Sequence, residues 1–98
     1  MKIFWSAAAL QNFEQSIDYI AAHNPSAAVR VARAIDRTAQ ELSTFQTGRR
    51  GRVGGTYEKV VGRPPYILAY AIDEAHDRVV ILHVIHGAHD WPPGRWPR

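Results

Sequence analysis

RVVILHVIH, residues 78–86, decides the fold, because its pattern predicts a strand with apolar side chains on both faces. Successive side chains of an extended chain point to opposite sides, so each face collects every second residue. One face would carry Val80, Leu82 and Val84, and the other would carry Val79, Ile81 and Ile85. A strand that is apolar on both faces is typically central in its sheet and covered on both sides. We therefore expect the rest of the fold to be built around it.

Three more β-prone runs precede this strand in the chain. Tyr66 to Asp73 is joined to it by the polar residues EAHD, which predicts a hairpin. Thr56 to Val61 comes before that pair, and Lys2 to Trp5 opens the chain. The sequence therefore predicts one strand near the N-terminus and three in the second half.

Two amphipathic helices are predicted between the first strand and the other three. Ser6 is a good N-cap, and apolar residues follow it at three- and four-residue spacing, namely Leu10, Phe13, Ile17 and Ile20. This helix should end near His23–Asn24, and Pro25 fits the first turn of the next one. The apolar side of the second helix consists of Ala28, Val31, Ala32, Ile35, Ala39, Leu42 and Phe45. The short break between the helices implies an antiparallel hairpin.

The element order β-α-α-β-β-β predicts an α+β fold, with a helical hairpin packed on a small, mostly antiparallel sheet. A chain of 98 residues suits a single domain, residues 1–98, and 46% hydrophobic with 21% charged residues is typical of a folded protein. The absence of cysteine excludes disulfides, thiolate zinc sites and cysteine nucleophiles, and suits a cytoplasmic protein. The apolar opening is short and interrupted by Ser6, so we expect neither a signal peptide nor a membrane span.

The positive charge is concentrated in the second half of the chain. The net charge is +3, and residues 49–98, with eight basic and five acidic side chains, supply all of it. Five of the cations, Arg49, Arg50, Arg52, Lys59 and Arg63, lie between residues 49 and 63, where Glu58 is the only acid. This pattern fits a surface for an anionic partner, or equally a solvated loop.

Metal and phosphate sites are poorly supported by the sequence. His83, His86 and His89 are three residues apart, but a strand sends His83 and His86 to opposite faces. We therefore expect no metal and no other cofactor. The run GRRGRVGG, residues 48–55, lacks the spacing and the Lys-Ser/Thr ending of a P-loop.

Metal-free RNA cleavage is the enzymatic hypothesis that the residues leave open. It requires a base, an acid and cations that stabilise the developing phosphorane charge. His83 or His86 could be the base, with the basic residues between 49 and 63 as cations. The alternative is that His83 is a half-buried sheet residue and His86 a hydrogen-bonded strand end.

The tail AHDWPPGRWPR, residues 88–98, allows two interpretations. Trp91 could cover the end of the sheet while Pro92 and Pro93 stop any helix. An exposed Trp96 beside arginines would instead have the composition of a binding hot spot.

The sequence resembles the RelE/ParE superfamily of type II toxins over nearly its whole length. The likeness includes SAAALQNFEQSIDYIAAHNPSAA after the first strand, the GR-rich loop with TYEKVV, and then PYILAYAID. The most specific part is VVILHVIHGAHDWP, which is similar to the ParE branch. The resemblance implies a small cytoplasmic toxin that a neighbouring antitoxin wraps and neutralises, with a role in growth arrest and plasmid stabilisation.

The superfamily has two activities, cleavage of mRNA on the ribosome (RelE) and inhibition of DNA gyrase (ParE). The ribonuclease branch typically has an arginine near the start of the strand that matches PYILAYAID, where this chain has Tyr66 and Ile67. This chain therefore has fewer of the cations that the ribonuclease branch uses. That difference favours the ParE branch, in which the toxin binds gyrase and performs no chemistry of its own. A RelE-like ribonuclease using Lys59, His83 and His86, and a non-toxic antitoxin-binding module, remain the alternatives.

Two surfaces are expected under the ParE hypothesis. The residues expected to contact the target are Arg49, Arg50, Arg52, Arg63, His86, His89, Asp90, Trp91 and Trp96. The residues expected to contact the antitoxin are Ala28, Val31, Ile35 and Leu42, which the sequence cannot distinguish from core.

Overall fold

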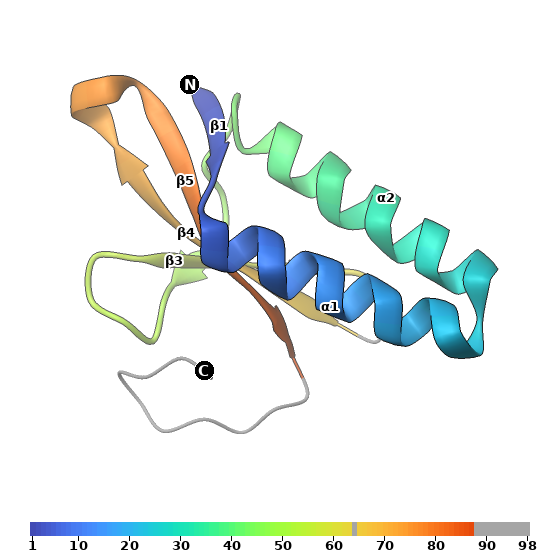
Figure 1. The fold of residues 1–98 in the computed structure, drawn as a ribbon. Coiled ribbons are helices and arrows are strands. Elements are labelled where there is room, and N and C mark those ends of the chain that lie inside the picture. The colour runs from blue at the N-terminus through green and yellow to red at the C-terminus, as the bar shows by residue number, and fades with distance from the viewer. Residues whose placement is uncertain (64, 88–98) are drawn as a thin grey trace.

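The computed structural model describes residues 1–63 and 65–87 of the chain (Figure 1). Its elements are β1 (Lys2–Trp5), α1 (Ala7–His23), α2 (Pro25–Glu41), β2 (Arg49–Arg50), β3 (Tyr57–Val61), β4 (Tyr66–Asp73), the 3-10 turn η1 (Glu74–His76) and β5 (Arg78–His86). The strands form one sheet in the order β1-β5-β4-β3-β2, with β1 parallel to β5 and the other neighbours antiparallel. The α+β fold expected from the sequence is confirmed, and the short strand β2 is an addition to it.

The helical hairpin begins and turns where the capping residues predict. Ser6 accepts a hydrogen bond from the Ala9 backbone N–H at 3.0 Å, which satisfies a donor that the first turn of α1 would leave unpaired. Asn24 does the same for Ala27 at 3.1 Å, and Pro25 occupies the first position of α2. The helices lie side by side (Figure 1). Their inner residues pack against side chains of β1, β4 and β5.

The predicted C-terminal end of α2 is wrong by one turn. The helix ends at Glu41, and Phe45, expected on its inner side, is 71% exposed. Leu42 instead fills the core, and the Gln46 side chain donates to its carbonyl at 2.7 Å. Serine and threonine at 43 and 44 favour turns over helix interiors, which explains the early end.

A bulge in β5 changes the predicted alternation of its side chains. Ala69 pairs with His83 and Tyr70 with Ile81, so Leu82 has no partner in the ladder. Val84 therefore joins Val79 and Ile81 in the core under the helices, contrary to the strict alternation expected from the sequence.

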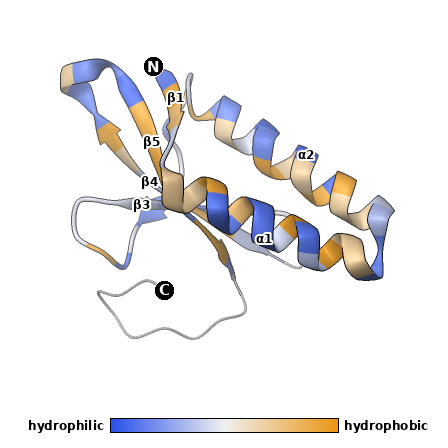
Figure 2. Ribbon diagram, viewed as in Figure 1, coloured by the Kyte–Doolittle hydropathy of each residue, from blue (hydrophilic) through white to orange (hydrophobic). Residues whose placement is uncertain are grey.

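The outer face of β5 is only partly covered. Ile85 lies in a second cluster with Ile67 and Ala69, whereas Val80 and Leu82 are only half-buried. β5 is thus an interior strand next to the central β4, and most of its length is coloured as hydrophobic in Figure 2. Its residues Val79, Ile81 and Val84 belong to the main core. No helix in residues 1–63 and 65–87 is long and apolar enough to cross a membrane.

Candidate functional site

A groove of about 870 Å³ lies where the hairpin end of the helices meets the ends of β3, β4 and β5. Most of its lining is apolar or aromatic, with Tyr19, Ile20, Ala27, Val31, Ala34, Ile35, Val61 and Tyr66 among the residues. Arg30 and Arg63 supply its positive charge, and His86 lines it from the end of β5. An apolar groove with two cations suits an amphipathic segment that carries acidic groups.

The four residues expected to contact an antitoxin divide between the core and this groove. Val31 and Ile35 line the groove, and only Val31 is partly exposed. Ala28 and Leu42 are buried and do not line it, which agrees with the core alternative that the sequence left open for them. The helical spacing that selects Val31 selects the core residues as well, because both belong to the same side of α2.

His86 is fixed at the sheet end of the groove. It is paired with Tyr66 across the β4–β5 ladder, and the two rings pack edge to face with their centroids 5.3 Å apart. The Gly87 N–H donates to the Pro65 carbonyl at 2.8 Å, and a Cβ at Gly87 would lie only 2.9 Å from that oxygen. Burial, with a smaller contribution from Tyr19, raises the pKa of Tyr66 above its ordinary value.

His83 is held by Asn12, a residue for which the sequence gave no functional expectation. β1 pairs with β5 only as far as Ile81, and beyond it the Asn12 Oδ1 accepts the Val84 N–H at 3.2 Å. The same oxygen lies 3.0 Å from His83 Nδ1, so that nitrogen must carry the proton of the neutral ring. Burial lowers the pKa of His83, which favours the neutral form. The only sequence signal was a short polar residue beside the apolar positions of α1.

Asn12→Ala should destabilise the fold by about 1–2 kcal/mol, because the partly buried Val84 N–H loses its acceptor. Urea unfolding followed by circular dichroism measures the change. Gln11→Ala is the matched control, since Gln11 is an exposed amide on the same helix and should change stability by less than about 0.5 kcal/mol. Equal losses in both variants would contradict a specific role for Asn12.

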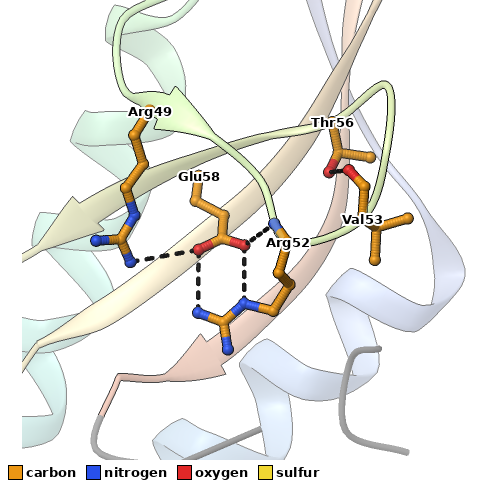
Figure 3. Close-up of polar contacts among 5 residues, drawn as sticks. All are labelled: Arg49, Arg52, Val53, Thr56 and Glu58. Atoms are coloured by element: carbon orange, nitrogen blue, oxygen red, sulfur yellow. Dashed lines mark hydrogen bonds and ion pairs between the residues drawn. The ribbon is translucent and has the colours of Figure 1, made fainter. Parts of the chain in front are cut away.

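Glu58 binds two arginines of residues 48–55, which we call the basic loop (Figure 3). Its carboxylate is 2% exposed and accepts the Arg52 backbone N–H at 2.8 Å, Arg52 Nε at 2.9 Å and a second Arg52 guanidinium N–H at 3.0 Å. Arg49 adds a longer contact at 3.4 Å. Burial alone would raise the pKa of Glu58, but these hydrogen bonds and charges hold it below its ordinary value.

Further hydrogen bonds and one tight glycine shape the loop, although its sequence predicts only a basic loop. The Gly51 N–H donates to the Thr56 carbonyl at 2.8 Å, and the Thr56 hydroxyl donates to the Val53 carbonyl at 2.6 Å. Gly48 has φ +125°, and a Cβ there would lie 2.5 Å from the Glu58 carbonyl oxygen, so only glycine fits. Arg49 and Arg52, two of the cations expected to face the target, are thus engaged within the loop.

The residues expected of a ribonuclease do not converge. Lys59 pairs with Leu68, whose side chain faces the helices, whereas His83 pairs with Ala69, which belongs to the cluster on the other face. His86 lies in the groove at the strand end. Within residues 1–63 and 65–87, no three side chains of the metal-binding types come together. His89, Asp90, Trp91 and Trp96 lie outside the described residues.

Comparison with known proteins gives consistent matches. Residues 3–91 match the family described as the ParE toxin of the type II toxin–antitoxin system parDE. A protein of Sinorhizobium fredii (strain NBRC 101917 / NGR234) with the provisional name toxin Y4kP is 35% identical over 92 residues, 93% of each chain.

Solved structures share the fold. A chain of the chromosomal ParDE system from P. aeruginosa aligns with a TM-score of 0.77 and 18% identity, covering 88% of this chain and 95% of that one. A chain of the toxin–antitoxin complex RelBE2 from Mycobacterium tuberculosis aligns with a TM-score of 0.61 and 27% identity, covering 90% and 92%. The chain therefore belongs to the ParE toxin family of type II toxin–antitoxin systems, within the RelE/ParE superfamily.

Proposed function

We propose that this toxin arrests growth by binding DNA gyrase in the cytoplasm, without chemistry of its own. The observation that carries the proposal is the match of residues 3–91 to the ParE toxin family. The register supports it, because Lys59 and His83 lie on opposite faces of the sheet. Electrostatic stabilisation by converging cations is usually the largest catalytic term, and a ribonuclease would need such a set.

Neutralisation is assigned to an antitoxin that places an apolar, acidic segment in the groove. The apolar lining around Val31 would bury its nonpolar side, and Arg30 and Arg63 would pair with its carboxylates. The exposed edges β1 and β2 could each accept an added strand. The ParDE and RelBE2 neighbours are themselves parts of toxin–antitoxin systems, which supports such a partner.

The target surface is proposed to include the groove end and the tail. His86 is held by Tyr66 two residues before the tail begins, and Arg50 and Arg63 are exposed. His89, Asp90, Trp91 and Trp96 would extend this surface from beyond the described residues.

Induced expression without antitoxin should stop thymidine incorporation early while amino-acid incorporation continues, because a trapped gyrase blocks replication before translation. Pulse labelling of both precursors in one culture measures this. The His86→Ala, Trp91→Ala double variant should lose most of the effect at equal expression. His23→Ala, at the exposed end of α1, is the control and should remain toxic.

An early stop in translation would instead favour the ribonuclease and return Lys59, His83 and His86 to the catalytic set. Growth that continues with both precursors incorporated would contradict toxicity and favour an antitoxin-binding module. Unchanged arrest in the double variant would refute the target surface while leaving gyrase as the target.

A further inference from the structure

The three arginines of the basic loop lie on two different faces of the sheet. Residues directly opposite each other in an antiparallel pair share a face. Arg49 is opposite Glu58 and joins Arg52 in the ion pair with it. Arg50 is opposite Tyr57, so it lies on the other face, where it is exposed. Glu58 thus engages two cations and leaves Arg50 on the face away from its carboxylate.

Tyr57 lies beside Arg50 and presents an exposed aromatic ring that is packed on a buried one. Its ring is stacked on Tyr70 with centroids 5.5 Å apart and planes 25° apart, and it is 36% exposed. Tyr70 is fully buried, and its hydroxyl donates to the Thr47 carbonyl at 2.5 Å, so the inner ring of the stack is fixed. A half-exposed ring on a fixed partner loses little conformational freedom when a third ring stacks on it.

Lys59 completes this surface. It lies two residues beyond Tyr57 on β3, and alternate residues of a strand share a face. Arg50, Tyr57 and Lys59 therefore form a strip with one aromatic ring and two cations, which we name the edge strip. Cations that follow a sugar–phosphate backbone and an aromatic ring that stacks a base are the two elements of single-strand recognition.

We propose that the edge strip binds a single-stranded nucleic-acid segment, with a base stacked on Tyr57 and phosphates contacted by Arg50 and Lys59. The Tyr57–Tyr70 pair already stabilises the sheet. An acidic peptide would pair with the cations but would not use the exposed face of the Tyr57 ring as a base does. This inference goes beyond the proposed function, since binding to gyrase requires no nucleic-acid contact by the toxin. Arg49 and Arg52 act only indirectly, because their pairing with Glu58 fixes the loop that carries Arg50.

Fluorescence anisotropy with labelled single-stranded DNA and RNA oligonucleotides and the purified full chain tests the proposal. Tyr57→Ala should weaken binding about ten-fold, since loss of base stacking is the expected effect, and Tyr57→Phe should restore it. Arg50→Ala should weaken binding several-fold and reduce the salt dependence by about one phosphate contact. Arg33→Ala, an exposed arginine on α2, removes the same charge and should change the affinity by less than about two-fold. Circular dichroism should show that all variants are folded.

Three outcomes would overturn the inference. The wild-type chain would bind neither oligonucleotide, or Arg33→Ala would weaken binding as much as Arg50→Ala, which indicates net charge alone. Alternatively, the edge-strip variants would keep their oligonucleotide affinity and lose the antitoxin on size-exclusion chromatography, which assigns the strip to that partner. Pulse labelling in cells is scored separately, so gyrase inhibition could stand while this inference fails.

Discussion

Ala27→Trp should raise the Kd of the toxin–antitoxin complex about 100-fold, equivalent to about 2.7 kcal/mol, and release the toxin from neutralisation. Ala27 is partly exposed and lines the groove proposed to receive the antitoxin. An indole ring there would occupy space that the partner must fill, and a packed interface tolerates added volume poorly. Titration of purified toxin with the product of the adjacent reading frame measures the affinity, and co-expression measures the escape from neutralisation.

Val29→Trp is the matched control for this substitution. Val29 lies on the same helix, is 49% exposed and does not line the groove, so the added indole should leave the Kd within about three-fold. Equal affinities for Ala27→Trp and wild type would show that the antitoxin docks elsewhere. Weak binding by both tryptophan variants would indicate a general effect on α2 rather than on the groove.

The sequence predicted the elements best where local chemistry specifies them. Ser6 and Pro25 mark the helix starts because each suits the backbone geometry of a first turn. The bounds of β1, β4 and β5 agree with the expectation, since their β-branched and aromatic residues favour strands. The two-residue strand β2 was not predicted, because two arginines have no strong preference for a strand. They adopt one only by pairing with β3 in the folded protein.

The site could be predicted only in part, because its details depend on tertiary contacts. A bulge at Leu82 is not encoded by local alternation, so the face of Val84 was misassigned. Helical spacing selects Ala28 and Val31 equally, although only Val31 reaches the groove. The sequence showed Glu58 only as the one acid among five cations, and its burial follows from contacts with Arg52 that form in the folded loop.

Glu58→Gln should destabilise the folded state by about 2–3 kcal/mol at neutral pH, because removing one partner of a buried ion pair leaves the other charge uncompensated. The loss falls below that of a fully buried pair, since the Arg52 side chain is 20% exposed and retains contact with water. For a domain of this size the melting temperature should fall by roughly 10–20 °C. Glu14→Gln makes the same chemical change at an exposed position of α1 and should have little effect.

The pH dependence tests whether the charge of Glu58 is responsible for its contribution to stability. Its pKa in the folded state lies below the ordinary value of 4.5, because hydrogen bonds and charges from Arg52 and Arg49 outweigh the effect of burial. A carboxylate with a lowered folded pKa stabilises the fold above its unfolded pKa and loses that contribution as the pH falls through the folded value. The stability difference between wild type and Glu58→Gln should therefore be constant above pH 4.5 and shrink below it. Urea unfolding at successive pH values measures this difference, and other carboxyl groups, such as Asp73, cancel because both proteins contain them. A difference that persists at low pH would mean that the amide NH2 group introduced by the substitution, which faces the Arg52 donors, causes the loss rather than the missing charge.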